Sequence, residues 1–310
     1  MRKLSLMMIA LPAAIAAAQD DGSDALLRGL TEAAPVMAMD RVELHVMPAL
    51  ELDQVSAVTA DSNGHLYILQ RGKAADPIIV TDANGKRLRS FGEGLFNRPH
   101  SIRLDANGNV WTVDSNTSMV YKHSPAGEKL LEISVGNLWP DPPSESCAAS
   151  DIAFTANGHV YVADGYCNSR IVEYDAAGQK VREWGRPGTG PGEFDLPHSI
   201  AVSPEGNVYV ADRENGRVQW FTPEGSYLGE WKFGGRVLSV VFASSGELYV
   251  SAEPKGAPPQ QEATLLHVDR SDGSILGRID EFGHELSVGP DGALLPASLT
   301  DQIAIYRPRH

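Results

Sequence analysis

Positive charge, cysteine and long apolar runs are all scarce in this chain of 310 residues. The 26 lysine and arginine residues stand against 40 aspartate and glutamate residues, so the formal net charge is −14, which argues against a nucleic acid or an anionic membrane as partner. The apolar run from Leu4 to Ile15 is too short to span a bilayer. Hydrophobic residues still make up 42 % of the chain, which excludes wholesale disorder and allows a large core.

The N-terminus has the layout of a secretory signal. Two basic residues precede the apolar run, and Ala16 to Ala18 then offer a small-residue cleavage site. We therefore expect a signal peptide over residues 1–18 and a secreted or periplasmic mature chain with no membrane segment; an uncleaved membrane anchor is the alternative. Residues 19–40 are expected to form a flexible leader, so that a single folded domain covers residues 41–310.

The two cysteines, Cys147 and Cys167, take a specific meaning in an exported chain. In an oxidising compartment an isolated pair usually forms a disulfide. Such a bond would close a loop of about twenty residues and would stabilise the fold by about 3 kcal/mol. Two free buried thiols are the alternative.

Most of the chain consists of six copies of one pattern, in which two alternating apolar runs flank a turn that ends in glycine. The turn glycines recur at intervals of 40 to 50 residues, at Gly64, Gly108, Gly158, Gly206, Gly246 and Gly292. A period in the forties with strand–turn–strand signals is typical of a β-propeller blade. A second turn glycine follows in five copies, which gives each copy about four strands. The chain is predicted to be all-β, a single six-bladed β-propeller; a β-sandwich or two separate domains are the alternatives.

The sixth copy lacks its outermost strand, because the chain ends at His310. The segment 42–50, which precedes the first copy, has the pattern of a strand. We expect this segment to pair into the last blade and to close the ring, since an open ring would leave unpaired strand edges.

Aligning the six copies separates the residues that build every blade from those that occur in particular blades. Just before the first apolar run, blades 2, 4 and 6 carry His100, His198 and His284, whereas the other three blades carry no histidine there. The first strand of each blade lines the central channel, so these imidazoles are expected to converge at one end of it. Three histidines with an open fourth position are typical of a catalytic zinc site. Structural histidines bonded to the channel backbone are the alternative.

Polar residues at the ends of the second strands are expected to reach the same mouth of the channel. They are Arg71 in blade 1, Tyr166 in blade 3 and Arg213 in blade 4. A tyrosine has an ordinary pKa near 10, and a neighbouring guanidinium or zinc ion would stabilise its phenolate and make it a usable base. Arginine also binds carboxylates in a fork. Solvated residues at the blade edge are the alternative for the two arginines.

The strings VADGYCNSRIVEY, LPHSIAV and VADRENGRVQWF resemble the peptidyl-α-hydroxyglycine α-amidating lyases, and the resemblance runs from about residue 50 to 305. It implies a propeller of NHL-type repeats that cleaves a small-molecule or peptide α-hydroxyglycine into an amide and glyoxylate. We expect such a chain to be a monomer. The implied site consists of one zinc ion on His100, His198 and His284, a catalytic Tyr166, active-site arginines Arg71 and Arg213, and a disulfide between Cys147 and Cys167.

The resemblance also implies a structural calcium ion, held by the backbone carbonyls of Val58 and Ile102 and by the carboxylate of Glu285. The chain departs from the family at this point. Its sixth blade reads GHEL, where the family has a proline before the histidine and an aspartate after it. Glu285 is one methylene longer than aspartate, which would move the calcium ion or weaken its binding.

Two other functions account for less of the pattern. A non-catalytic NHL propeller that binds a protein or glycan partner would need neither a tight zinc ion nor Tyr166. A metal-dependent hydrolase or lactonase on a similar propeller would favour acidic and amide ligands around calcium, and three histidines argue against that. Metal analysis separates the three hypotheses, because about one zinc ion per chain favours the lyase.

Overall fold

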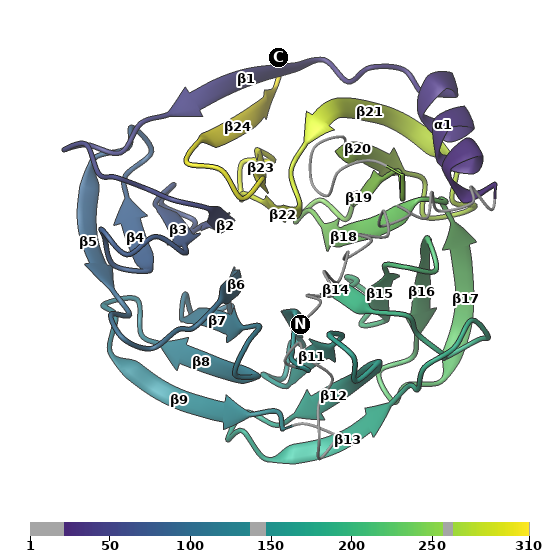
Figure 1. The fold of residues 1–310 in the computed structure, drawn as a ribbon, viewed down its shortest axis with the longest axis horizontal. Coiled ribbons are helices and arrows are strands. Elements are labelled where there is room, and N and C mark those ends of the chain that lie inside the picture. Colours follow the sequence, from purple (N-terminus) through teal and green to yellow (C-terminus); the bar gives the residue numbers. More distant parts are fainter. Residues whose placement is uncertain (1–21, 137–146, 257–262, 310) are drawn as a thin grey trace, which may run out of the picture.

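The computed structural model describes residues 22–136, 147–256 and 263–309, which form a ring of six four-stranded sheets around a central channel (Figure 1). The predicted all-β, six-bladed propeller is therefore confirmed. The expected signal peptide, residues 1–18, lies outside the described residues. Within the described part, no helix has the length and apolar character needed to cross a bilayer.

Each blade runs from an inner strand beside the channel to an outer strand at the rim (Figure 1). From the inside outward, the first three blades contain β2 (Val55–Ala60), β3 (Leu66–Gln70), β4 (Ile78–Thr81) and β5 (Arg87–Phe91); β6 (Pro99–Leu104), β7 (Val110–Asp114), β8 (Met119–His123) and β9 (Lys129–Ser134); and β10 (Asp151–Phe154), β11 (Val160–Asp164), β12 (Arg170–Tyr174) and β13 (Lys180–Trp184). The other three contain β14 (Pro197–Val202), β15 (Val208–Asp212), β16 (Arg217–Phe221) and β17 (Tyr227–Lys232); β18 (Arg236–Phe242), β19 (Leu248–Glu253), β20 (Ala263–Val268) and β21 (Ile275–Phe282); and β22 (Glu285–Val288), β23 (Leu294–Ala297), β24 (Ile303–Pro308) and β1 (Met39–Leu44).

The position of a strand within its blade decides how its side chains are buried. Every residue of the second strands, such as β3 and β11, is buried, because neighbouring blades cover both faces of these strands. Outer strands such as β5 and β13 are largely exposed or half-buried. The first turn of each blade places its glycine at a φ between 75° and 94°, a left-handed conformation that glycine adopts without a Cβ penalty.

Hydrophobic side chains fill the seams between neighbouring blades. Between blades 1 and 2, for example, Tyr67 and Ile78 pack in one cluster with Ile102 and Val110. Similar clusters occur at each of the other five seams in the described part of the chain. The core is therefore a set of radial layers between the blades rather than one central mass.

The ring closes through the pairing that the sequence predicts. Strand β1 runs antiparallel to β24, with Met39 opposite Pro308 and Leu44 opposite Ile303. The predicted bounds, 42–50, are wrong, because the strand begins at Met39 and ends at Leu44. After Leu44 the chain crosses to blade 1, where the Met47 backbone N–H donates to the carbonyl of Gly85 (2.8 Å), so these residues no longer extend the sheet of blade 6.

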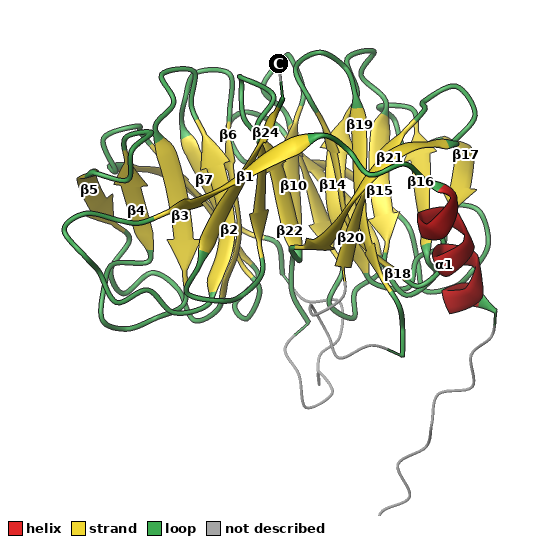
Figure 2. Ribbon diagram, turned by 90° about the horizontal axis from the view of Figure 1, so that it is seen from above, coloured by secondary structure: helices red, strands yellow, loops and turns green. Residues whose placement is uncertain are grey.

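The expected flexible leader, residues 19–40, is also wrong in its described part. Helix α1 (Ser23–Ala33) lies against the rim of blade 5 (Figure 2). Leu27 is buried in the cluster between blades 4 and 5, and the Arg278 guanidinium donates to the carbonyl of Thr31 (2.8 Å). Gly234 makes room for the helix, since a Cβ there would lie 2.1 Å from the Ser23 carbonyl oxygen. This docking depends on a distant loop, so the local pattern did not predict it.

We expect the closing strand to contribute to stability through the seam between blades 6 and 1. Leu44 is 9 % exposed in that seam, whereas Val42 on the same strand is 45 % exposed. Leu44→Ala should lower the free energy of unfolding by about 2–4 kcal/mol. Val42→Ala is the matched control and should lower it by less than about 1 kcal/mol. Denaturant unfolding measures both, and equal effects would contradict the assigned packing.

Candidate active site

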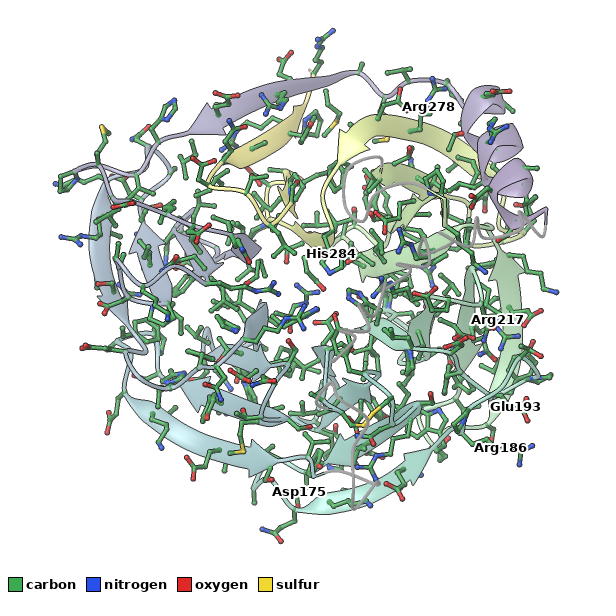
Figure 3. The ribbon with its side chains drawn as sticks, in the orientation of Figure 1. Asp175, Arg186, Glu193, Arg217, Arg278 and His284 are labelled. Carbon is green, nitrogen blue, oxygen red and sulfur yellow. A yellow bond between two sulfur atoms is a disulfide. The ribbon has the colours of Figure 1, made fainter. Side chains whose placement is uncertain are left out.

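The structure brings His100, His198 and His284 together in the central channel. His100 and His198 stand on the inner strands β6 and β14, and His284 directly precedes β22. Figure 3 shows His284 pointing into the ring, whereas Asp175 and Arg186 lie at the rim. The centroids of the imidazole rings lie 5.0 Å apart for His100–His198, 5.8 Å for His100–His284 and 4.6 Å for His198–His284. All three side chains are buried.

The hydrogen bonds of His198 orient its ring for metal binding. Its Nδ1 lies 2.7 Å from the backbone carbonyl of Leu238, which only accepts, so Nδ1 carries the proton and Nε2 presents its lone pair. Burial lowers the pKa of His198 to about 3 and lowers the pKa values of His100 and His284 well below their ordinary value. The neutral imidazole is the form that binds a metal ion.

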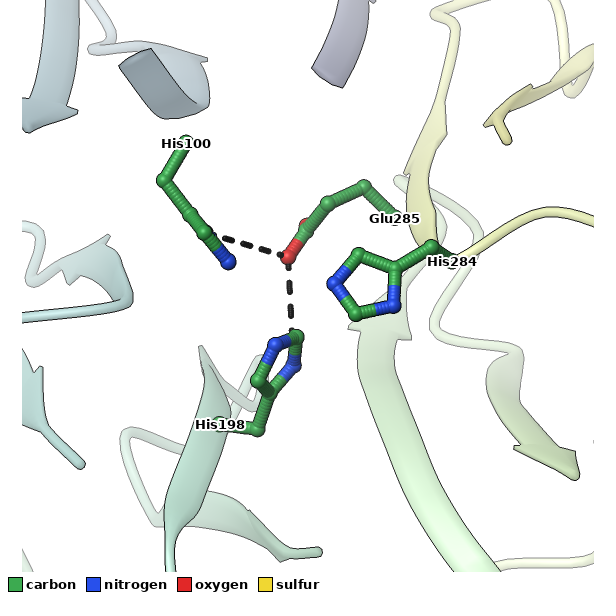
Figure 4. Close-up of side chains that lie close together, drawn as sticks. All are labelled: His100, His198, His284 and Glu285. Atoms are coloured by element: carbon green, nitrogen blue, oxygen red, sulfur yellow. Dashed lines mark ion pairs between the residues drawn. The ribbon is translucent and has the colours of Figure 1, made fainter. Parts of the chain in front are cut away.

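Glu285 adds a carboxylate to the three histidines. The four residues offer ligand atoms that all lie within 4.8 Å of one another (Figure 4). Glu285 Oε1 lies 3.7 Å from His100 Nδ1 and 4.0 Å from His198 Nδ1. Glu285 Oε1 and the Nδ1 atoms of His100 and His284 are buried and have no hydrogen-bond partner among the described residues. A buried nitrogen-rich donor set with unpaired atoms fits a metal ion of the zinc type better than calcium.

The hydroxyl of Tyr166 lies at the open edge of this cluster. It is 2.9 Å from His100 Nε2 and 3.3 Å from His198 Nε2. Burial raises the pKa of Tyr166, although the guanidinium groups of Arg213, Arg98 and Arg71 act in the opposite direction. The arginines therefore favour a phenolate, as expected, but burial outweighs them, and the phenolate needs additional positive charge close by.

The backbone around Tyr166 is tied on both sides. The predicted disulfide joins Cys147 to Cys167, with 5.1 Å between their Cα atoms, and Tyr166 exchanges two backbone hydrogen bonds of 2.9 Å with Ala148. On the other side, Gly165 packs directly against blade 4, since a Cβ there would lie 2.0 Å from the carbonyl oxygen of Pro197. These contacts hold Tyr166 beside His198, the residue that follows Pro197.

Arginine side chains surround the same mouth. Arg71 Nε donates to the carbonyl of Pro99 (2.9 Å), and burial lowers the pKa of Arg71 to about 10, so its side chain stays charged near neutral pH. Arg213 Nε lies 3.2 Å from a carboxylate oxygen of Glu214. Sequence reasoning missed a third arginine, Arg98, whose guanidinium carbon lies 5.9 Å from the centroid of the Tyr166 ring.

The strings that carried the family resemblance also contain structural pairs. In blade 3, Arg170 Nε donates to Asp164 (2.7 Å), and in blade 4, Arg217 Nε donates to Asp212 at the same distance. All four of these residues are buried. The first pair closes the loop that carries Tyr166, and the second pair closes the loop that carries Arg213. The family-like sequences therefore contain both structural residues and site residues.

The residues expected to hold calcium do not fit that ion. Arg103 Nη1 donates to the carbonyl of Ile102 (3.3 Å), and Arg103 Nη2 donates to Glu285 Oε2 (3.1 Å). Two of the three groups expected to bind calcium therefore already accept hydrogen bonds from Arg103. Sequence reasoning missed Arg103, although the repeat alignment contained a signal. At the equivalent position, the other five blades carry the uncharged residues Thr59, Ala153, Ala201, Val241 and Ser287.

Comparisons with known proteins agree with this architecture. The NHL repeat family model matches residues 147–174 and 194–221. Among solved structures, virginiamycin B lyase from Staphylococcus aureus is similar with a TM-score of 0.60 and 16 % identity, over 84 % of this chain and 82 % of that chain. At this identity the likeness concerns the fold alone.

Curated relatives give a more specific assignment. Peptidyl-glycine alpha-amidating monooxygenase A of Xenopus laevis is 33 % identical over 79 % of this chain. This chain spans only about a quarter to a third of the length of the first such monooxygenases. The probable peptidyl-alpha-hydroxyglycine alpha-amidating lyase pgal-1 of Caenorhabditis elegans is 32 % identical, over 81 % of each chain. These names support a lyase-like enzyme, and the chain belongs to the peptidyl-α-hydroxyglycine α-amidating lyase family.

Proposed function

We propose that this protein is a zinc-dependent lyase that cleaves the bond between nitrogen and Cα in a peptidyl- or acyl-α-hydroxyglycine and releases an amide and glyoxylate. The observation that carries this proposal is the position of the Tyr166 hydroxyl, within 3.3 Å of the Nε2 atoms of two buried histidines. A proton acceptor and a metal-binding cluster at one point are what this cleavage needs.

The donor set suits zinc, with His100, His198 and His284 as ligands. Zinc bound there would lower the pKa of the substrate hydroxyl and would add the positive charge that favours the Tyr166 phenolate. Tyr166 then takes the proton of the hydroxyl group. The carbon–oxygen bond becomes the aldehyde carbonyl of glyoxylate as the carbon–nitrogen bond breaks, and the bonding pair moves to the nitrogen. The proton returns to that nitrogen, so the amide leaves neutral and the atoms balance.

The arginines at the mouth suit the substrate carboxylate. A guanidinium binds a carboxylate through two parallel hydrogen bonds, which fixes its orientation. Arg71 and Arg213 flank Tyr166 closely enough to act on its pKa. We assign to them the binding of the carboxylate and the electrostatic support of Tyr166.

The place of action is proposed on two features of the chain. Residues 1–18 have the layout of a secretory signal, and the disulfide between Cys147 and Cys167 suits an oxidising compartment. The substrate is therefore expected outside the cytoplasm, as a free small molecule or a peptide terminus.

The direct test is to incubate the purified protein with an N-acyl-α-hydroxyglycine and to measure glyoxylate. We expect release that stops after treatment with a zinc chelator and returns when zinc is added. Elemental analysis should find about one zinc ion per chain. His198→Ala should lose both zinc and activity, whereas His267→Ala, on the peripheral strand β20, should keep both. A protein that binds no zinc and releases no glyoxylate would instead support a non-catalytic scaffold.

Tyr166→Phe isolates the proposed base. Removing one hydroxyl should lower kcat by about 100-fold to 10,000-fold, because the proton acceptor is lost, while the zinc content stays unchanged. Tyr174→Phe is the matched control, since Tyr174 is a buried tyrosine of the same blade, and it should keep full activity. Full glyoxylate release by the Tyr166→Phe protein would remove this residue from the mechanism.

A further inference from the structure

The guanidinium of Arg103 lies beside Glu285, which also faces the histidine cluster. It donates hydrogen bonds to four oxygen atoms. Nη2 donates to Asp151 Oδ2 (2.9 Å) and to Glu285 Oε2 (3.1 Å). Nη1 donates to Ser287 Oγ (3.0 Å) and to the carbonyl of Ile102 (3.3 Å). These oxygens come from the inner strands of blades 2, 3 and 6, so one side chain links three blades across the channel.

Arg103 supplies positive charge beside two buried carboxyl groups. Asp151 and Glu285 are 0 % and 1 % exposed, and two buried carboxylates are costly unless positive charge and hydrogen bonds compensate them. Arg103 Nη2 lies 2.9 Å from an Asp151 oxygen and 3.1 Å from a Glu285 oxygen, so the guanidinium is in direct contact with both groups. Glu285 is thereby shared, with Oε2 bonded to Arg103 and Oε1 directed at the histidines.

A calcium ion would need the same oxygens. Calcium takes six to eight oxygen ligands at about 2.3–2.6 Å, whereas the carbonyl of Ile102 and the carboxylate of Glu285 already accept N–H groups from Arg103. A divalent ion placed beside these atoms would also be repelled by the guanidinium. The two cations therefore exclude each other.

A cavity of about 260 Å³ adjoins Arg103 within the channel. Its lining includes Arg103, Ser287 and Thr59. The Arg103 side chain is 13 % exposed, so it is in contact with solvent at this level of the channel.

We propose that Arg103 is the built-in cation of the channel, and that its guanidinium occupies the position where a calcium ion is expected from the family resemblance. The protein then needs no calcium for stability. The inference concerns Arg103, Asp151 and Glu285 and goes beyond the proposed reaction. The tests below measure bound calcium and thermal stability. Their outcome is therefore independent of whether the protein has lyase activity.

The first test uses the unmodified protein. After dialysis against calcium, elemental analysis should find no stoichiometric calcium, and the Tm should be the same in calcium as in a calcium-selective chelator. About one tightly held calcium ion per chain, with a Tm that falls in the chelator, would overturn the proposal.

The second test converts the site. Arg103→Ala combined with Glu285→Asp removes the guanidinium and shortens the carboxylate, so in chelator the Tm should fall by roughly 5–10 °C, because buried carboxylates lose their partner. Calcium, but not magnesium at the same concentration, should raise that Tm again. Arg103→Lys keeps a positive charge and should show no calcium response. Arg41→Ala removes an exposed arginine and should change neither Tm nor calcium response.

These variants test the role of Arg103 even if a substitution impairs folding. If the double variant folds and calcium does not raise its Tm, the position is not equivalent to a calcium site and the proposal is wrong. If the double variant does not fold in chelator, refolding with calcium in the buffer should recover it, and failure to do so would count equally against the proposal. A calcium response in Arg103→Lys would contradict the role of its charge.

Discussion

The pairing of β1 with β24 is the interaction on which the geometry of this protein depends. Without it, the sixth blade would end in an open edge, and the seam between blades 6 and 1 would lose Leu44. With the ring closed, the six inner strands are held around one channel. Residues at the same register of alternate blades then meet at its centre, although they are far apart along the chain. The cluster of three histidines and Glu285 is a property of this closure rather than of any local motif.

The channel is organised by charge as much as by packing. Hydrophobic seams pack neighbouring blades against one another, and buried polar groups of the inner strands must be compensated within the channel. At the mouth, arginines surround Tyr166 and the histidines stay neutral because they are buried. One layer below, Arg103 balances Asp151 and Glu285. Glu285 connects the two layers, because its two oxygens face different partners.

The sequence predicted the fold, and the convergence of three histidines in the channel, because the chain is repetitive. The recurring glycine turns predicted the blades, and comparison of equivalent positions singled out His100, His198 and His284. The same comparison would have found Arg103 and Asp151, since both are charged at positions where most blades have small or apolar residues. Attention to the histidine register alone left them unnoticed.

Other features depend on contacts that no repeat records. Helix α1 packs where Gly234 leaves space in the loop between blades 4 and 5, and β1 ends where the chain must cross to blade 1. The pKa of Tyr166 reflects the balance between burial and three guanidinium groups, which depends on distances in the folded ring. Such balances follow from three-dimensional packing and could not be read from the order of residues.

The closure of the ring also sets the order in which the molecule can be completed during translation. Strand β1 leaves the ribosome long before β24, so the earliest strand of the propeller must wait for the latest one. Blades that form in between present a free edge until β24 has been made, a stage at which nascent chains are prone to misassociate. His284 belongs to the same final blade. A nascent chain that has not yet reached β22 lacks His284 and therefore cannot assemble the three-histidine cluster.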